Sequence, residues 1–217
     1  MAAAHLEMRG ITKWYPASGV LANDHVDFEV RRGEVHALVG ENGAGKSTLV
    51  RILDGVVHAD SGSIAIDGRP VTIRSPRDAM RHGIGMVHQH LRLIPSLSVA
   101  ENVVLGIEPR RHGVILDEAA ALLSVSEAAR RFELPVEPGS PVSELDVGAL
   151  QHVELLKLLV RNARVLVLDE PAAVLTDQQT EALFRTLRSL AAAGRTVVVV
   201  THGIEDVLDF ADRVTVL

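Results

Sequence analysis

A loop of eight residues, from Gly40 to Ser47, has the composition of a phosphate-binding loop. It reads Gly-Glu-Asn-Gly-Ala-Gly-Lys-Ser and matches the pattern G-x-x-x-x-G-K-[ST]. Its glycines permit backbone conformations in which several N–H groups point inward, and a following helix adds free N–H groups and the positive end of its dipole. The sequence therefore predicts a cradle for a polyphosphate. A glycine-rich turn that matches the pattern by chance is the alternative.

The side chains at the end of this loop predict separate contacts with a bound nucleotide. We expect Lys46 to reach the β- and γ-phosphates, the Ser47 hydroxyl to bind Mg²⁺, and Thr48 to help hold the α-phosphate. The nucleotide-binding residues predicted in the loop and directly after it are Gly40, Asn42, Gly43, Ala44, Gly45, Lys46, Ser47 and Thr48.

Two adjacent acids, Asp169 and Glu170, close the apolar run 165–168. Placing two carboxylates at the end of a buried strand is costly without a cation, and a phosphate-binding loop brings Mg²⁺ with its nucleotide. We expect Asp169 to hold the metal through water, and Glu170 to orient and deprotonate an attacking water. Either acid alone could cap the turn that follows the strand, but this alternative does not account for the pair.

The segments around these residues have the patterns of alternating strands and helices. Short apolar runs predict buried strands at 35–39, 84–87, 165–168 and 196–200, and helical spacing with capping residues predicts helices at 48–54, 76–81, 117–132, 150–159 and 176–193. The carboxyl ends of parallel strands meet at one edge of a sheet. We therefore expect four polar or loop positions along that edge: Gly40, Gln89, Asp169 and His202.

The order of these elements predicts an α/β fold with a single domain over residues 1–217. We expect a core with a mostly parallel sheet from 1–92 and 163–217, which includes an N-terminal antiparallel β subdomain with a hairpin at Asp67-Gly68. Helical patterns over 93–162 predict an inserted helical subdomain. Trp14, Tyr15 and Pro16 are expected in a loop, where Tyr15 either covers the edge of the core or stacks on a nucleotide base.

The composition argues against other classes of protein. The net charge is −6 and no dense run of Lys or Arg is found, whereas nucleic-acid-binding domains usually carry a basic stripe. Cys is absent, and a metal site at His88 and His90 has no third ligand cluster in the sequence. No apolar run approaches the ~18 residues of a membrane span, and the N-terminus lacks the basic start and apolar core of a secretory signal. We expect peripheral membrane contact and no nucleic-acid partner.

The chain resembles the ATP-binding cassette of ABC transporters over essentially all 217 residues. The resemblance is carried by the order of six features: an aromatic residue, the phosphate loop, a strand-end Gln, a helical insert, the Asp-Glu pair and a strand-end His. The resemblance implies an ATPase with ATP and Mg²⁺ as cofactors and with the catalytic residues Lys46, Gln89, Glu170 and His202. It implies the metal ligands Ser47, Gln89 and Asp169, an adenine-stacking role for Tyr15, and the D-loop of the family at 173–176.

A closer resemblance is to the tandem-cassette ATPases of simple-sugar and nucleoside importers, and it is carried by residues 85–90 and 101–106. It implies that the chain is the first cassette of a longer polypeptide and powers the import of a sugar or nucleoside. The implied partners are a second ATP-binding cassette and transmembrane permease subunits at the cytoplasmic face of the cell membrane. The alternatives are a regulatory cassette that binds ATP with little turnover, and a soluble cassette protein that acts on DNA or ribosomes.

One segment departs from the family pattern. Where the family has Leu-Ser-Gly-Gly-Gln, or Leu-Ser-Val-Gly-Met in the nucleoside group, this chain has Leu-Asp-Val-Gly-Ala at 145–149. In the family this signature faces the nucleotide of another cassette, so the departure concerns the opposite site and leaves the chain's own cradle intact. We expect Asp146 to cap the helix that begins near Gly148.

Overall fold

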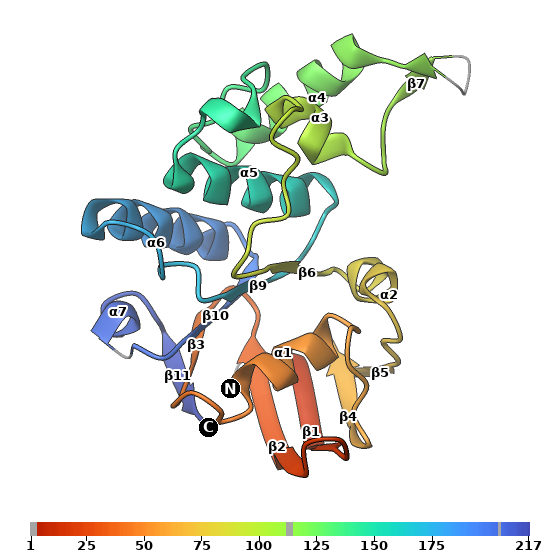
Figure 1. Cartoon of the computed structure of the whole chain (residues 1–217), viewed down its shortest axis with the longest axis vertical. Helices are drawn as coiled ribbons and strands as arrows, with labels where there is room; N and C mark the ends of the chain where they lie inside the picture. The colour runs from red at the N-terminus through yellow and green to blue at the C-terminus, as the bar shows by residue number, and fades with distance from the viewer. Residues whose placement is uncertain (1–3, 112–114, 204) are drawn as a thin grey trace.

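The computed structural model describes residues 4–111, 115–203 and 205–217, and it confirms the predicted α/β fold class. A four-stranded antiparallel sheet and a five-stranded parallel sheet form the scaffold (Figure 1). The antiparallel sheet has the order β2-β1-β4-β5, with the bounds Val20–Arg31, Ala4–Tyr15, Ser61–Ile66 and Arg69–Val71. The parallel sheet has the order β11-β3-β10-β9-β6, with the bounds Arg213–Val216, Val35–Val39, Thr196–Thr201, Val165–Asp169 and Ile84–Val87.

The parallel sheet is covered on both faces, which explains its uninterrupted apolar runs. Every residue of β3, β9 and β10 is buried. One face packs against α5 (Val147–Val160) and α6 (Asp177–Ala192), and the other packs against α1 (Lys46–Leu53) and the antiparallel sheet (Figure 1). Because successive side chains of a strand point to opposite faces, Ala37 and Val39 join the first cluster and Leu38 joins the second.

The predicted hairpin and the helix after it are confirmed. Asp67 and Gly68, between β4 and β5, have φ values of 50° and 71°, as the central residues of a type I′ turn require. The next helix, α2 (Pro76–Arg81), begins after Ser75, whose side chain accepts a hydrogen bond from the Asp78 amide. These local signals act over four residues or fewer, so the sequence alone specifies them.

The expected loop at Trp14 and Tyr15 is wrong. Both residues belong to β1, where Trp14 pairs with Leu21 and Tyr15 with Val20 of β2. Aromatic side chains favour strands, and β2 supplies the cross-strand partners that are not visible in a local pattern. Pro16 follows the last residue of β1 and cannot donate to the ladder, so the strand ends there.

Helices dominate the segment between the two parts of the core, as the pattern predicts. They are α3 (Val99–Val104), α4 (Glu118–Arg131), a short 3₁₀ helix (Val142–Glu144) and α5, and Figure 1 shows α3 and α4 beyond α5 at the end of the molecule away from the antiparallel sheet. At the start of α3, Ser98 and Glu101 form a capping box, the S/T-x-x-E arrangement of a helix start. A two-stranded ladder of β7 (Arg110–Arg111) and β8 (Ile115–Leu116) was not predicted. The subdomain boundaries near 92 and 163 stay a prediction.

Candidate nucleotide site

The phosphate loop joins β3 to α1, as expected. Lys46 is only 5% exposed, and its ammonium group donates hydrogen bonds to the carbonyl oxygens of Gly40 (2.7 Å) and Glu41 (3.0 Å). The cation therefore lies across the loop and holds its two ends together. Ser47 is exposed and Thr48 is half-buried at the start of α1, while Asn42 and Gly43 form the exposed tip of the loop and Ala44 is half-buried.

Gly45 shows why the loop needs glycine at its last turn. Its φ is +95°, and a Cβ added there would overlap the carbonyl oxygen of Ala22 and lie 2.6 Å from Asn23 Nδ2. Gly45 directly precedes α1 and has no side chain that could cap the helix, so the N–H groups of the first helical turn stay free to bind an anion. By contrast, a Cβ at Gly43 (φ +89°) would meet no atom within 4 Å, so this glycine is needed for its backbone conformation alone.

The register of the parallel sheet brings the predicted residues to one edge. Thr201, the last residue of β10, pairs with Val39 of β3, and Val200 pairs with Asp169 of β9. On the other side of β9, Val87 of β6 pairs with Leu168. Gly40 and His202 directly follow β3 and β10, Asp169 is the last residue of β9, and Gln89 lies two residues after the end of β6, so the four predicted positions lie along a single edge.

Asp169 combines burial with an unsatisfied oxygen. It is 8% exposed, and its Oδ1 has no hydrogen-bond partner in the described part of the chain. Burial raises the pKa of this carboxyl, the neighbouring charge of Glu170 raises it further, and the positive charges of Arg51 and Lys46 oppose both effects. A buried carboxylate oxygen without a donor is costly, and a cation removes that cost. The site therefore fits Mg²⁺ held by Asp169 and by the exposed hydroxyl of Ser47.

The other ligands of such an ion would not come from a cluster of protein side chains. Among the residues the structure describes, no group of three or more His, Asp or Glu side chains is arranged to hold a metal. Mg²⁺ usually keeps several water ligands and binds through one or two protein oxygens and the phosphates of its substrate. Asp169 and Ser47 are donors of the right type and number for that arrangement.

Glu170 and His202 are in direct contact. His202 Nδ1 lies 2.9 Å and 2.8 Å from the two carboxylate oxygens of Glu170. Because a carboxylate only accepts hydrogen bonds, Nδ1 carries the proton and donates it. Glu170 has a φ of +51°, which is uncommon for a residue other than glycine, and its amide donates to the Val200 carbonyl (2.9 Å). The fold thus holds Glu170 in a strained backbone conformation at the strand end.

Gln89 and Tyr15 are placed less tightly. Gln89 is exposed, and the hydrogen bonds between described residues include none from its side chain. Tyr15 is half-buried at the end of β1, with Lys13 Nζ 5.6 Å from the centre of its ring. Asn23 on the paired strand donates from Nδ2 to the Gly45 carbonyl (3.3 Å), so this sheet touches the phosphate loop. The stacking role of Tyr15 stays a prediction, and the contact of Asn23 was missed because no local pattern marks it.

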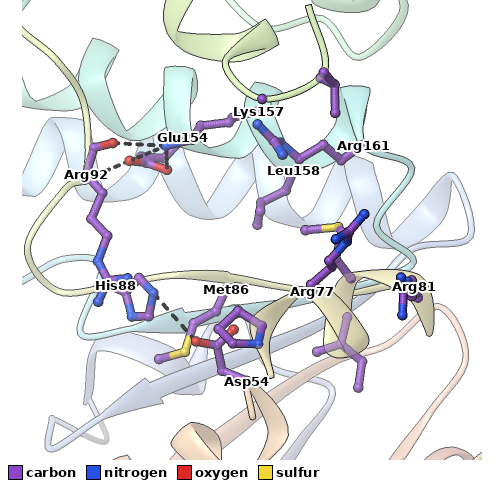
Figure 2. A pocket seen from close by; sticks show the side chains of 15 residues that line it. Asp54, Arg77, Arg81, Met86, His88, Arg92, Glu154, Lys157, Leu158 and Arg161 are labelled. Carbon is purple, nitrogen blue, oxygen red and sulfur yellow. Dashed lines mark hydrogen bonds and ion pairs between the residues drawn. The ribbon is translucent and has the colours of Figure 1, made fainter. Parts of the chain in front are cut away.

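Two hollows lie near the carboxyl edge. A cavity of about 310 Å³ is lined by Glu170, His202 and the predicted D-loop residues Ala173 and Leu175. A larger cavity of about 860 Å³ lies between the core and α5, where Asp54 and His88 face Arg92, Glu154 and Lys157 (Figure 2). The first adjoins the candidate catalytic pair, whereas no residue of the phosphate loop lines either cavity.

Asp146 caps α5, as predicted. Its side chain accepts a hydrogen bond from the Ala149 amide (2.8 Å), which is one of the N–H groups left free at a helix start. The segment that departs from the signature pattern therefore carries a negative charge at the helix terminus. His152, six residues after Asp146 on the same helix, is 8% exposed, and burial lowers the pKa of its imidazole.

The phosphate loop, the Asp-Glu pair and the order of elements agree with a family model described as ABC transporter, which matches residues 23–173. The chain belongs to the ABC transporter family. Solved structures support the same assignment: the cassette is similar to cbiO1 from Clostridium perfringens, described as part of an ABC transporter complex, with 29% identity, a TM-score of 0.83, and 98% of this chain and 84% of that one covered.

The fold is also that of an ATP-binding cassette described in its ADP conformation, MJ1267 (TM-score 0.85, 24% identity, 100% of this chain and 88% of that one). The predicted ABC ATPase fold is therefore confirmed. In sequence, the cassette is 49% identical to the ribose import ATP-binding protein RbsA 1 of Rubrobacter xylanophilus, with 98% of this chain and 42% of that protein covered. It is 43% identical to the glucose import ATP-binding protein TsgD13 of Haloferax volcanii, with 98% and 43% covered.

The cassette spans about two-fifths of the length of these relatives. Within its described ranges, none of the helices combines the length and the apolar character that crossing a membrane requires.

Proposed function

We propose that this chain is the first ATP-binding cassette of a tandem importer ATPase, and that it binds and hydrolyses ATP to power the import of a sugar. The names of the similar proteins, which are ribose and glucose import ATP-binding proteins, favour a sugar over a nucleoside. Coverage of only about two-fifths of each relative leaves room for a second cassette. The observation that carries the proposal is the contact of Glu170 and His202 beside the buried, unpartnered oxygen of Asp169.

The loop residues would hold the triphosphate of ATP. The free N–H groups at the start of α1 and the ammonium of Lys46 would bind the negatively charged phosphate oxygens. Lys46 would exchange its hydrogen bonds to two loop carbonyls for bonds to these oxygens. Ser47, Asp169 and Gln89 would hold Mg²⁺. When bound, this ion supplies positive charge that stabilises the charge developing on the phosphates.

Glu170 is the proposed general base. Its carboxylate accepts the proton of the water that attacks the γ-phosphorus, while the P–O bond to ADP breaks and phosphate leaves. His202 holds this carboxylate through Nδ1, and its Nε2, which has no hydrogen-bond partner among the described residues, would approach the γ-phosphate. Gln89, which follows β6 on the same edge, would orient the water.

The partners in this proposal are the second cassette and transmembrane permease subunits, at the cytoplasmic face of the membrane. A second candidate function, an ATP-binding regulatory cassette with little turnover, is favoured by one observation. Asp146 places a carboxylate on the N–H group of Ala149, where the family signature would present uncharged donors. Because this segment would face the nucleotide of the other cassette, the two sites of such a pair would differ. Under that alternative, the chain takes ATP and closes with little turnover beside an active second cassette.

Substitution of Glu170 by Gln tests the proposal. An amide cannot take the proton of water, so we expect ATP affinity to be retained and hydrolysis to fall by about 10²-fold or more. Calorimetry measures the affinity and steady-state phosphate release measures the rate. The matched control is Glu181→Gln, which removes an exposed carboxylate paired with Arg185 on α6 and should leave the rate unchanged. Slow turnover in the parent that does not change in Glu170→Gln would support the regulatory cassette instead.

A further inference from the structure

Two side chains of α5 hold the backbone at Arg92 (Figure 2), three residues after Gln89 in the chain. Glu154 Oε1 accepts a hydrogen bond from the Arg92 amide (2.8 Å), and Lys157 Nζ donates to the Arg92 carbonyl (3.0 Å). Lys157 also lies 3.3 Å and 3.2 Å from the two Glu154 oxygens. One ion pair therefore satisfies both backbone groups of a single residue 62 and 65 positions away in the sequence.

Burial makes this arrangement specific. Glu154 is 5% exposed, and the side chain of Lys157 is only 18% exposed. Removing one member of this arrangement destabilises the fold, because the charge or N–H group that it leaves behind has lost its hydration and has no hydrogen-bond partner. Surface ion pairs rarely fix a backbone, but this pair has a buried carboxylate and a half-buried ammonium, and all of its polar atoms are hydrogen-bonded.

The chain between this pair and the sheet is short. Strand β6 ends at Val87, and Gln89 lies only three residues before Arg92. Three residues span at most about 10 Å, so fixing Arg92 confines Gln89 to a small volume next to the strand end. The segment after Arg92 is fixed as well, because Asn102 of α3, which is 1% exposed, accepts from the Ile94 amide (2.7 Å) and donates to the Ile94 carbonyl (3.0 Å).

We propose that Glu154 and Lys157 are positioning residues for Gln89. They fix the backbone at Arg92, so that the position of Gln89 depends on α5 as well as on β6. The proposal rests on the function proposed above, in which Gln89 orients the attacking water. It makes α5, which begins at the signature segment, the element that sets the distance of Gln89 from the catalytic edge. Neither residue touches the nucleotide.

Hydrolysis by the full chain under single-turnover and steady-state conditions tests this proposal. Glu154→Ala should lower kcat about tenfold or more through misplacement of Gln89, with KM and the ATP dissociation constant changed by less than about twofold. Glu154→Gln keeps an acceptor for the Arg92 amide and should recover most of kcat. Lys157→Met, which removes the donor to the Arg92 carbonyl, should lower kcat in the same way and serves where Glu154→Ala does not fold.

Glu34→Ala is the matched control. Glu34 is 7% exposed, accepts from the Arg31 amide (2.8 Å) and pairs with Arg213 (3.3 Å), but it lies at the opposite end of the sheet, before β3. We expect the melting temperature of Glu34→Ala to fall by as much as that of Glu154→Ala. At temperatures below its melting transition, Glu34→Ala should keep the kcat of the parent. Equal kcat values for the two variants, or a kcat in Glu154→Gln as low as in Glu154→Ala, would overturn the positioning role.

Hydrogen exchange separates this proposal from the proposed function. The Arg92 amide should exchange slowly in the parent and Glu34→Ala, and faster in Glu154→Ala. Addition of ATP and Mg²⁺ should protect residues 88–91 in the parent and in Glu34→Ala but not in Glu154→Ala. A parent that does not hydrolyse ATP while this exchange pattern holds would reject the ATPase function alone. A pattern that is the same in all variants would reject the positioning role.

Discussion

At the residue scale, Asp54 carries the clearest electrostatic cost among the described side chains. It lies at the C-terminal end of α1, is 7% exposed, and its Oδ2 accepts no hydrogen bond from the described residues. The nearest basic group is His88, with Nε2 at 3.7 Å, and burial raises the pKa of Asp54 to about 6, while the charge of Arg92 opposes the shift. The negative end of the α1 dipole also disfavours a carboxylate there.

The raised pKa of Asp54 predicts a pH-dependent stability. Between pH 4 and 6 the folded state binds this proton more tightly than the unfolded state, whose pKa is near 3.8, so stability falls as pH rises through that window. Asp54→Asn removes the titration. We expect the free energy of unfolding of the variant, relative to that of the parent, to increase by about 1 kcal/mol from pH 5 to pH 7.5. Urea unfolding at both pH values measures this difference. The opposite trend, with the parent gaining at the higher pH, would show that Asp54 is paired.

At the scale of elements, the start of α5 combines a structural cap with an unusual charge. Asp146→Ser keeps a capping oxygen for the Ala149 amide and removes the negative charge. We expect the free energy of unfolding and the ATP affinity of the chain to stay within about 0.5 kcal/mol of the parent, whereas Asp146→Ala should cost about 1 kcal/mol of stability. ATP-dependent association with the partner cassette should strengthen in Asp146→Ser, because repulsion of the opposing phosphates is lost. Weaker association in this variant would contradict the argument.

The sequence predicts those elements whose signals are local. The buried strands at 35–39 and 165–168, the capping boxes at Ser98 and Thr176, and the turn at Asp67-Gly68 follow from runs or pairs of adjacent residues. The edge that gathers Gly40, Gln89, Asp169 and His202 also follows, since parallel strands align their carboxyl ends.

Contacts between distant segments could not be predicted in the same way. Tyr15 lies on a strand because β2 returns to pair with it, and no periodicity within 14–16 indicates that partner. The hydrogen bond of His202 to Glu170 and the hold of Glu154 on Arg92 depend on side-chain directions that only the packed sheet and α5 define. The unsatisfied oxygen of Asp54 has the same origin, because the sequence does not indicate how deeply this residue is buried.

At the scale of the whole molecule, the catalytic edge is open to solvent. Ser47, Gln89 and His202 are exposed, although hydrolysis requires water other than the attacking one to be excluded. We expect the rate per chain to rise with protein concentration, because in the proposed function a second cassette covers this edge. Phosphate release measured over a wide range of chain concentration checks this, with Glu170→Gln as the background. A constant rate per chain would mean that one cassette suffices.

The central place of β10 has a consequence for biosynthesis. Its neighbours in the sheet are β3, which is made early, and β9, which is made shortly before it. Until β10 leaves the ribosome, β3 lacks both of its sheet neighbours, β10 and β11, and presents apolar faces and unpaired backbone groups, a state that favours aggregation. We therefore expect the growing chain to bind nucleotide only after β10 has been synthesised. A nascent chain that stops before Thr196 should depend on chaperones, whereas one that includes Thr201 can pair β3 with β10 beside its phosphate loop and lacks only the edge strand β11.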